Sequence, residues 1–378
     1  MELSKTMKTP RVERPTRAII NLAAISKNVA EVRKRIRDKR KLMAVVKADG
    51  YGHGSVEVSR IALESGADCL GVALPEEGEH LRKAGFDVPI VVLGLIQPNE
   101  AYKAVHSSLD QTVCSPELAE ALDQEARKAS VRINVHIKVD TGMGRIGVNP
   151  RDVSSFVRRI QRLKNLRVIG IFSHFASADK ADKTFSEKQM ETFNQVIREM
   201  QLTGIEIPQK HMANSAGVLD LPESYYDLVR PGIIIYGLYP STEVSRNIKL
   251  KPAMTLKTKI SFLKTVPPGT AISYGRTFVT ENETTVATLP VGYGDGYSRL
   301  LSGRGEVLIN GCRAPLIGRV CMDMCMVDVS RLEDVKAGDD VILFGQEPSV
   351  DEIAATIGTI NYEVLCALGK RVPRIYVQ

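Results

Sequence analysis

The sequence predicts an α/β fold in which a TIM-type (β/α)8 barrel is followed by a smaller, mainly β domain. Eight short apolar runs alternate with helical stretches up to about residue 250, and the pattern then changes to period-two alternation. Eight strand–helix units in roughly 220 residues fit such a barrel, for which about 250 residues is typical. The full length of 378 residues leaves room for a second domain.

The predicted barrel strands are rich in Val and Ile on both faces, as expected of parallel strands with helices outside and packed side chains inside. They are Leu42–Val46, Cys69–Ala73, Pro89–Leu93, Gln111–Val113, Asn134–Val139, Val168–His174, Gln209–Ala213 and Leu228–Tyr236. Helical periodicity between them predicts helices that include Ala24–Arg37, Pro116–Arg127 and Glu187–Leu202. Ser26 and Ser115 are the predicted N-caps of the first two helices.

A doubly wound sheet is the competing fold, and its signature would be an early glycine-rich loop. The segment Gly142-Met143-Gly144-Arg145-Ile146-Gly147 matches G-x-G-x-x-G and follows a predicted strand. However, it falls at the fifth unit, and no acidic residue follows about 20 positions later to bind a ribose. We therefore interpret the match as accidental and prefer the barrel.

The chain after residue 250 predicts a mainly β domain. Residues 255–262 alternate with period two, and Asn310-Gly311 between two apolar runs, Val307–Ile309 and Ala314–Ile317, predicts a hairpin. Further strands are predicted at Val341–Phe344 and Arg374–Val377, a helix at Val350–Ile357, and a strand of the same domain at Ala18–Asn21. We expect a flexible basic tail at residues 1–16, the barrel at 17–249 and the β domain at 250–378.

Composition argues against several classes of protein. An apolar content of 43% and a charged content of 25% are ordinary for a soluble domain, and no run approaches the roughly 20 apolar residues of a membrane span. The first ten residues lack the apolar core of a signal peptide. The net charge of +7 is dispersed, so we expect an anionic small molecule rather than nucleic acid as the partner. The six cysteines form no Cys-x-x-Cys pair, which predicts free thiols in a cytoplasmic protein without a metal site.

Lys47 is the most informative residue for chemistry. It follows the apolar run Leu42–Val46 and opens the loop Ala48-Asp49-Gly50-Tyr51-Gly52-His53-Gly54. Desolvation or a neighbouring cation lowers the pKa of such an amine and frees it as a nucleophile, for which aldehydes and pyridoxal phosphate are usual partners. By position alone, a lysine that merely reaches solvent is an equal alternative.

Polar motifs follow other predicted strands in both domains. They are Ile137–Arg145, Ser173-His174-Phe175, Ala213–Ala216, Val229–Ile233, Ile272–Arg276 and Gly318–Asp323. Together with Lys47, their order and spacing resemble the alanine racemase family, the fold-type III pyridoxal phosphate-dependent amino-acid racemases, over all of the chain except the tail. The resemblance implies a pyridoxal 5'-phosphate-binding barrel and a homodimer whose β domains contribute to the partner's active site. It also implies interconversion of L- and D-alanine by two-base proton transfer at Cα, which supplies D-alanine for peptidoglycan.

The resemblance also implies the catalytic roles. Lys47 would form the Schiff base with the cofactor and exchange a proton on one face of the substrate, while Tyr274 would do so on the other face across the dimer interface. His174 would hydrogen-bond the tyrosine and relay to Arg230, which would donate to the pyridine nitrogen. Because a guanidinium only donates, that nitrogen would stay unprotonated, and reprotonation at Cα would be favoured over transamination.

The remaining site residues are assigned by the same resemblance. The expected cofactor contacts, mostly to the phosphate, are Tyr51, Asn214, Ser215, Gly232, Ile233 and Tyr362. Arg145 and the backbone of Met322 would hold the substrate carboxylate, and Lys138, at a position often carbamylated in the family, would brace Arg145. The residues expected at the mouth of the site are Tyr293, Tyr362 and Asp323.

Three alternatives stay open from the sequence. A racemase of the same fold with serine, lysine or a broad range of amino acids as substrate differs mainly in pocket volume, and one methylene is worth only about 1–3 kcal/mol. A decarboxylase of the same fold is disfavoured by Arg230, because decarboxylation benefits from a protonated ring. A non-catalytic pyridoxal phosphate carrier is disfavoured by the β domain with Tyr274 and Met322.

Overall fold

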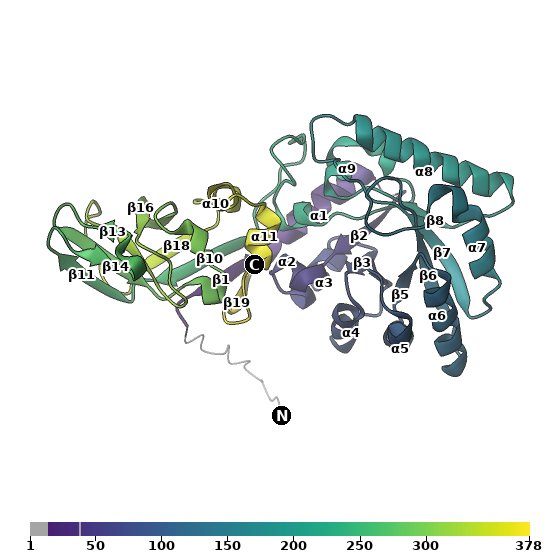
Figure 1. Ribbon diagram of the computed structural model, residues 1–378, viewed down its shortest axis with the longest axis horizontal. Helices are drawn as coiled ribbons and strands as arrows, with labels where there is room; N and C mark the ends of the chain where they lie inside the picture. Colours follow the sequence, from purple (N-terminus) through teal and green to yellow (C-terminus); the bar gives the residue numbers. More distant parts are fainter. Residues whose placement is uncertain (1–13, 38) are drawn as a thin grey trace, which may run out of the picture. The chain divides into compact units, whose positions relative to one another are not determined.

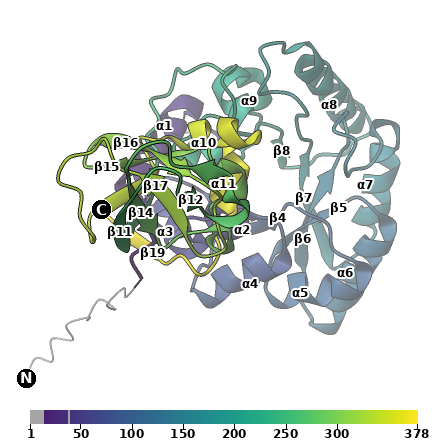
Figure 2. The same ribbon diagram turned by 60° about the vertical axis from the view of Figure 1, so that its left-hand side comes forward.

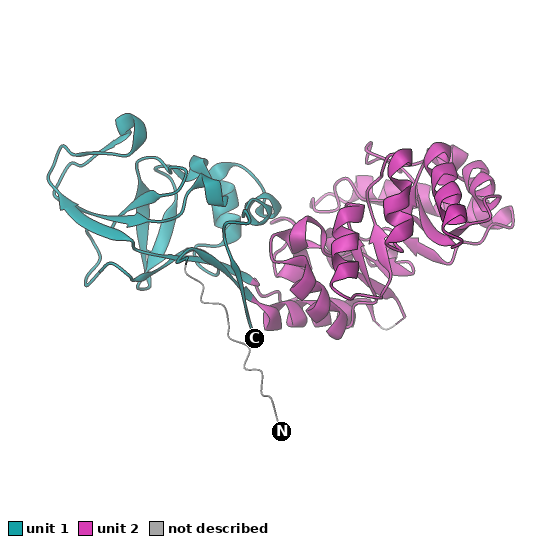
Figure 3. Ribbon diagram, turned by 90° about the horizontal axis from the view of Figure 1, so that it is seen from below, with its two compact units in different colours: residues 1–20, 254–377 teal, residues 21–253, 378 magenta. Residues whose placement is uncertain are grey.

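The computed structural model describes residues 14–37 and 39–378, which form two compact units (Figure 3). One unit comprises residues 21–253 and residue 378, and the other comprises residues 254–377 with the N-terminal segment up to Ile20. The division therefore differs from the predicted boundaries at residues 17 and 250. The reason is that β1 (Arg17–Asn21) pairs antiparallel with β10 (Met254–Lys259), as the strand predicted at Ala18–Asn21 required.

The expected tail at residues 1–16 needs correction where it is described, and residues 1–13 lie outside the described part. Thr16 is fully buried, and its hydroxyl contacts the Thr258 hydroxyl at 2.8 Å and donates to the Pro290 carbonyl at 2.7 Å. Arg14 forms an ion pair with the buried Asp295 at 2.7 Å. Hydrogen bonding and burial thus fix residues 14–16 in the β unit.

The unit of residues 21–253, magenta in Figure 3, is a closed barrel of eight parallel strands in the order β2 to β9, with β9 pairing back to β2. Figure 1 labels β2, β3 and β5 to β8 among these strands. The strands are β2 (Lys41–Val45), β3 (Cys69–Val72), β4 (Ile90–Val92), β5 (Asp110–Val113), β6 (Ile133–Lys138), β7 (Leu166–Phe172), β8 (Gln209–His211) and β9 (Leu228–Val229). Met43, Cys69, Val91 and Leu228 pack together across β2, β3, β4 and β9. The TIM-type barrel predicted from the eight apolar runs is confirmed.

Helices cover the outside of the barrel, and Figure 2 shows α4 to α8 around its strands. The helices of this unit are α1 (Leu22–Ile36), α2 (Lys47–Tyr51), α3 (Ser55–Glu64), α4 (Pro75–Lys83), α5 (Ala101–His106), α6 (Pro116–Lys128), α7 (Val153–Gln161), α8 (Thr184–Leu202) and α9 (Ser215–Asp220). Ser115 caps α6 as predicted, because its side chain accepts from the Leu118 N–H. Ser26 is not a cap: it lies inside α1, whose first turn is capped by Asn21.

The strand predicted at Leu228–Tyr236 is wrong beyond Val229. The chain leaves the barrel at Pro231, which has no N–H, and Ile233–Tyr236 form a short 3-10 helix, η4. All four residues of η4 are fully buried. Burial on every side produces the same apolar run as a barrel strand, so the pattern could not separate the two.

The other unit, teal in Figure 3 and called the β unit, contains a nine-stranded sheet in the order β11-β14-β17-β16-β15-β18-β10-β1-β19. Its further strands are β11 (Phe262–Val266), β14 (Thr284–Leu289), β15 (Glu306–Ile309), β16 (Cys312–Ile317), β17 (Cys325–Asp328), β18 (Asp340–Phe344) and β19 (Arg374–Val377), and β12 (Ala271–Ile272) pairs separately with β13 (Phe278–Val279). Two helices accompany them, the predicted α10 (Val350–Ile357) and the unpredicted α11 (Asn361–Cys366). The predicted mainly β domain is confirmed.

The hairpin at Asn310-Gly311 is confirmed, with both residues at positive φ (49° and 80°) between β15 and β16. The single strand predicted over residues 255–262 is instead split between β10 and β11. At the break, the Ile260 N–H donates to the Asp339 carbonyl, and the Ser261 N–H donates to the Thr288 carbonyl. The chain therefore changes neighbours there, from β18 to β14.

Candidate active site

The carboxyl ends of the barrel strands carry the polar residues that the sequence singled out. Lys138 ends β6, His174 follows β7 and Arg230 follows β9. Lys47 follows β2 in the same way. In barrels of this kind the reactive groups lie at this end of the strands, so the topology gathers these side chains at one end of the unit.

Lys47 begins the segment labelled α2 (Lys47–Tyr51), which is a left-handed turn rather than a regular α-helix. Ala48, Asp49, Gly50 and Tyr51 all have positive φ, at 51°, 52°, 61° and 51°. Each of the three non-glycine residues in this conformation costs roughly 1–2 kcal/mol. Strain of this kind persists only where the surroundings impose it, and it is typical of functional sites.

Hydrogen bonds from outside the turn impose this conformation. The Glu77 carboxylate of α4 accepts from the Ala48 N–H at 2.6 Å through Oε1 and from the Ala73 N–H at 2.7 Å through Oε2. It thereby connects the turn after β2 with the end of β3. Asp49 accepts from the Ser55 N–H at 2.8 Å and fixes the start of α3 to the same turn. Glu77 was missed by the sequence analysis, although a glutamate at the third position of a helix that begins with proline is a recognisable signal.

Arg230 is 4% exposed and is held by four groups. Its Nη2 donates to the carbonyls of Ser173 (2.8 Å) and Met212 (3.1 Å) and faces His174 Nδ1 at 3.3 Å. Its Nη1 faces His211 Nδ1 at 2.9 Å. Within the described ranges no carboxylate pairs with this guanidinium, so its charge is balanced by carbonyls and imidazoles alone. His211 was missed by the sequence analysis, because Gln209 and Lys210 in the same predicted strand are also polar and nothing local distinguished the histidine.

Burial and the guanidinium charge keep the neighbouring histidines neutral. Burial lowers the pKa of Arg230 to about 9, which leaves it charged at neutral pH. Burial, followed by the charge of Arg230, holds the pKa of His174 and of His211 well below the ordinary value. Because an arginine only donates, the Nδ1 atoms of both histidines must accept, and their protons lie on Nε2.

Lys138 is 2% exposed, and its amine lies over the Phe172 ring at 4.9 Å. Its Nζ donates to the Val139 carbonyl at 3.2 Å. Burial, and then the charge of Arg230, holds the pKa of Lys138 well below the ordinary lysine value. An amine in that state is available as a nucleophile. Arg145 is exposed in the loop after β6, and its charge also acts on Lys138.

The predicted phosphate-binding residues come together beside η4. Ser215, the first residue of α9, accepts from the Gly232 N–H at 2.9 Å through its hydroxyl. The Tyr51 hydroxyl lies so close to Gly232 that a Cβ there would be 2.4 Å from it. Ile233 follows as the first residue of η4. Asn214 caps α9, with its side chain accepting from the Gly217 N–H at 3.0 Å, so it also has a local structural function.

The other predicted residues belong to the β unit and are largely exposed. Tyr274, the first residue of η5 (Tyr274–Arg276), is 72% exposed, Met322 is 52% exposed, and Tyr293 of η6 (Tyr293–Asp295) is 43% exposed. The Tyr293 N–H donates to the Cys321 carbonyl, and the Gly294 N–H donates to the Met322 carbonyl, so these two segments are adjacent. The Asp323 carboxylate pairs with Arg371 at 2.6 Å, while Tyr362 lies half-buried on α11.

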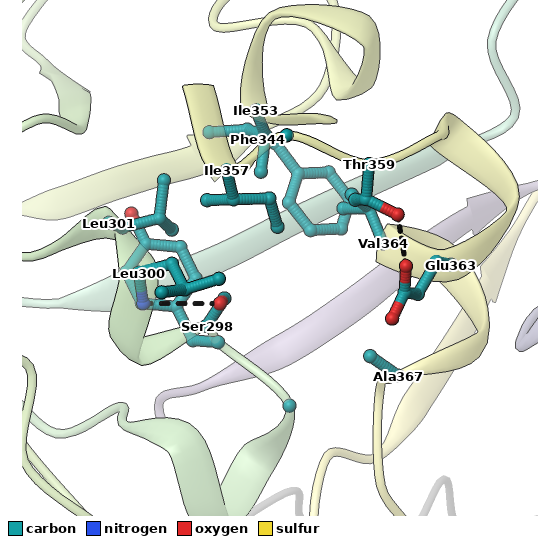
Figure 4. Close-up of a pocket in the computed structure, with 13 residues that line it drawn as sticks. Ser298, Leu300, Leu301, Phe344, Ile353, Ile357, Thr359, Glu363, Val364 and Ala367 are labelled. Carbon is teal, nitrogen blue, oxygen red and sulfur yellow. Dashed lines mark hydrogen bonds between the residues drawn. The ribbon is translucent and has the colours of Figure 1, made fainter. Parts of the chain in front are cut away.

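A cavity of about 320 Å³ lies elsewhere in the β unit (Figure 4). Apolar side chains that include Phe344, Ile353 and Ile357 form much of its wall, and the Thr359 hydroxyl donates to Glu363 at one side. None of the predicted site residues lines it. Across residues 14–37 and 39–378, no cluster of three or more His, Cys, Asp or Glu side chains has the arrangement of a metal site. Within the same ranges no helix has the length and apolar character of a membrane span.

Two models of protein families match the chain, one over most of each unit. The family model described as "Alanine racemase, N-terminal domain" matches residues 20–240, and the model described as "Alanine racemase, C-terminal domain" matches residues 253–376. The alanine racemase of Halothermothrix orenii is 48% identical over 370 residues, covering 97% of this chain and 98% of the relative. That of Desulforamulus reducens is 49% identical over 369 residues, covering 97% of this chain and all (100%) of the relative.

Solved structures agree with these sequence relatives. The alanine racemase of Clostridium difficile 630 superposes with a TM-score of 0.94 at 38% identity, covering 97% of each chain. The Bacillus anthracis alanine racemase with bound L-Ala-P has a TM-score of 0.92 at 37% identity, covering 97% of this chain and 95% of the other. The likeness therefore extends over nearly the full length of each protein.

Proposed function

Because the chain belongs to the alanine racemase family, we propose that it interconverts L-alanine and D-alanine with pyridoxal 5'-phosphate joined to the Lys47 amine. The observation that carries the proposal is the match to alanine racemases over 97% of the chain, at up to 49% identity. The positions of individual residues in the barrel also support the proposal. The strained turn at Lys47 and the buried guanidinium of Arg230 are placed at the same end of the barrel.

The residues fit an anionic pyridine aldehyde. The missing Cβ of Gly232 lets the Tyr51 hydroxyl approach the backbone where the Ser215 hydroxyl also lies, and hydroxyl and backbone N–H groups of this kind suit a phosphate. Lys47 would hold the aldehyde carbon, and Arg230 would donate to the pyridine nitrogen. Bound there, the cofactor would supply the electron-withdrawing ring that acidifies the Cα–H bond of an attached amino acid.

Arg230 decides which reaction follows. It has no carboxylate partner among the described residues and can only donate, so an acceptor nitrogen facing it stays unprotonated. An unprotonated ring withdraws electrons weakly, which favours rapid return of a proton to Cα. This property supports racemisation over decarboxylation or transamination.

Two proton carriers are needed on opposite faces of Cα. Lys47 would serve one face, and Tyr274 of a second copy of the chain would serve the other. The exposure of Tyr274, Tyr293 and Met322 in one region of the β unit supports a homodimer, because exposed apolar patches typically mark interaction surfaces. His174, with its proton on Nε2, is suited to stabilise the oxygen of a tyrosine that has given up its proton.

Arg145 and Lys138 would bind the substrate carboxylate. The exposed guanidinium of Arg145 suits a carboxylate, and the backbone of Met322 from a second copy would add to it. Because burial lowers the pKa of Lys138, its unprotonated amine would add to carbon dioxide to give a carbamate, with release of one proton. The negative carbamate would attract Arg145, whereas a charged lysine would repel it.

The physiological part of the proposal is D-alanine supply for peptidoglycan in the cytoplasm. All six cysteines of the chain are free, as is usual in a reducing compartment. The remaining cofactor contacts, from Asn214 and Tyr362, and the site mouth formed by Tyr293, Tyr362 and Asp323, are proposed on the same family basis.

The decisive experiment measures chirality and colour together. The purified chain is incubated with pyridoxal 5'-phosphate and L-alanine, and D-alanine is quantified while the visible absorbance of the bound cofactor is recorded. Bound colour with D-alanine formation is expected. A chain that stays colourless, or that binds the cofactor without changing the chirality of alanine, would contradict the proposal. A parallel panel with L-serine and L-lysine tests whether the specificity is broad.

A further inference from the structure

A line of buried polar side chains, formed by His211, His136 and Asp110, begins at Arg230. The proposed reaction assigns no role to these three residues. We propose that His136 and Asp110 are positioning residues that act through His211 to hold the Arg230 guanidinium in one orientation as a donor to the cofactor nitrogen. The inference rests on the proposed role of Arg230 and adds a second layer to it. It is supported by five contacts between side chains and by one glycine.

The first link fixes the proton on His211. Arg230 Nη1 lies 2.9 Å from His211 Nδ1, and a guanidinium has no lone pair to offer. His211 Nδ1 must therefore accept, and the ring proton lies on Nε2. The His211 ring stacks flat on Phe172, with centroids 4.7 Å apart and an interplanar angle of 3°, so it is held in this plane.

The second link passes the constraint to His136. His211 Nε2 lies 3.0 Å from His136 Nδ1, and both rings are fully buried. Because His211 donates here, His136 Nδ1 must accept and its own proton lies on Nε2. A single rotated or tautomerised ring would place two N–H groups, or two lone pairs, against each other somewhere along the line.

The backbone makes room for this arrangement. His136 pairs in register with Gly170 of β7, and the register shifts between Val135 and His136. A Cβ at Gly170 would lie 2.0 Å from His136 Nδ1. No side chain fits at that position, so Gly170 is required for the His136 ring to reach across β7 to His211 on β8.

Asp110 closes the line. Its Oδ2 lies 3.9 Å from His136 Nε2, a distance too long for a hydrogen bond but short enough for attraction or for one bridging water. His136 Nε2 has no other partner in the described part of the chain. Asp110 Oδ1 accepts from Asn134 at 3.0 Å, which orients the carboxylate. A negative charge at this end favours the Nε2–H form of His136, and hence of His211.

The hydrogen bonds of this line restrict the orientation of the Arg230 guanidinium. With His211 Nδ1 as a fixed acceptor, and with the carbonyls of Ser173 and Met212 on Nη2, the guanidinium is constrained from two sides. Loss of the acceptor on Nη1 would let the guanidinium rotate away from the position that the ring nitrogen requires. The expected defect is in turnover, because substrate binding depends on other residues.

The first test observes the histidines directly in the purified full-length chain. The chain has only six histidines, so a sample labelled with 15N at histidine gives a tractable long-range 1H–15N spectrum. His211 and His136 are assigned from the signals lost in His211→Asn and His136→Asn. Nε2–H forms of both are expected. A wild-type spectrum with the proton of His211 on Nδ1 would overturn the proposal.

The second test changes the far end of the line. Asp110→Asn should mix the tautomers of His136 and His211 and lower kcat about tenfold, with the KM for alanine within about twofold. Asp110→Glu, which keeps the charge, should restore most of the tautomer purity and turnover. Thr112→Val on the same strand β5 is the matched control, because it removes the buried hydrogen bond that the Thr112 hydroxyl donates to the Val92 carbonyl of β4. Thr112 pairs in register with His136, so the control changes a direct neighbour of His136 while it keeps every hydrogen bond of the line. It should leave tautomers and kcat unchanged.

The outcomes separate the two proposals. If Asp110→Asn leaves the tautomers unchanged, or if Thr112→Val lowers kcat as much as Asp110→Asn does, the positioning role is overturned. If the tautomers are as expected and respond to Asp110→Asn, but no amino acid is racemised by the wild-type chain, the proposed function is overturned. In that case the hydrogen-bonded line remains as a property of the barrel.

Discussion

The barrel unit and the β unit hold their proposed site residues in opposite ways. In the barrel, Arg230 and Lys138 are almost fully buried, and each has protein partners that fix its position. In the β unit, Tyr274 and Met322 expose more than half of their surface, at 72% and 52%. One set is organised within the chain, and the other presents side chains to the outside.

This difference indicates what each unit would contribute to the proposed active site. Burial in the barrel shifts pKa values, which sets the charge states of Lys138, His174 and Arg230. In the β unit, Tyr274 is 72% exposed within one copy, so under the proposed function a second copy would supply its surroundings. The proposed reaction thus takes electrostatics from the barrel and a proton carrier from the β unit of another subunit. The following predictions test this division, beginning with the largest effect.

Replacement of the barrel amine should have the largest effect. Lys47→Ala removes both the cofactor attachment and one proton carrier, so racemisation should fall at least about 10⁴-fold. Activity is measured as D-alanine formed, and the absorbance of bound cofactor should fall in parallel. Lys41→Ala on the same strand β2 is the control, because this lysine is exposed and should leave both readouts unchanged. An active Lys47→Ala protein would remove this residue from the mechanism.

Replacement of the exposed phenol should abolish proton transfer on one face only. Tyr274→Phe should lower racemisation about 10²- to 10⁴-fold while the cofactor stays bound. Mixing Tyr274→Phe with Lys47→Ala under conditions that exchange subunits gives the sharper result. In a homodimer with shared sites, about a quarter of the sites would then carry both native residues, so activity should reappear. Absence of any recovery, with subunit exchange demonstrated, would place both residues of a site in one chain.

The neutral histidines of the barrel predict a pH dependence of stability. The pKa of His174 and of His211 is lowered in the folded chain from the ordinary 6.5, so the unfolded state binds protons that the folded state rejects as pH falls below about 6.5. The free energy of unfolding should therefore decrease toward low pH, by about 1.4 kcal/mol per pH unit for each histidine. The free energy of unfolding is measured with urea at several pH values. Its change per pH unit should be smaller in His174→Gln than in wild type, by the amount that one proton contributes. His80→Gln, at an exposed position, should not show this decrease.

Replacement of Glu77, which supports the strained turn after Lys47, should have the smallest effect of the four changes. Glu77→Ala leaves the N–H groups of Ala48 and Ala73 without their carboxylate acceptor, which should lower the free energy of unfolding by about 1–3 kcal/mol. Because the turn begins at Lys47, cofactor affinity should also decrease. Glu79→Ala on the same helix is the control, since its partner Lys83 is a neighbour on the exposed surface. Equal effects of the two variants would show that Glu77 has no special role.

Local patterns were sufficient to predict much of the fold. The eight-stranded barrel, the Asn310-Gly311 hairpin and the helix at Val350–Ile357 depend on periodicity and turn chemistry within a few residues, and they are confirmed, although the eighth strand ends at Val229. The errors occurred where burial rather than periodicity fixed the conformation. Ile233–Tyr236 is apolar because it is buried on all sides, and the chain divides between β10 and β11 because its neighbours change there.

The candidate site followed a similar division. Lys47, His174 and Arg230 were identified by their place after apolar runs and by family resemblance. Glu77, His211 and Asp110 were missed because their importance lies in partners 29, 19 and 26 residues away in sequence, or further along a chain of contacts. Asn214 stays a prediction as a cofactor contact, and the structure adds that its side chain caps α9.

The amino-acid sequence by itself determined the barrel, the β domain and the types of reactive group, because apolar period, turn residues and motif order are properties of short segments. Only the tertiary structure decided which groups are charged and which way their hydrogen bonds run. Charge states depend on burial and on the guanidinium of Arg230, and neither exists until distant strands close into a barrel.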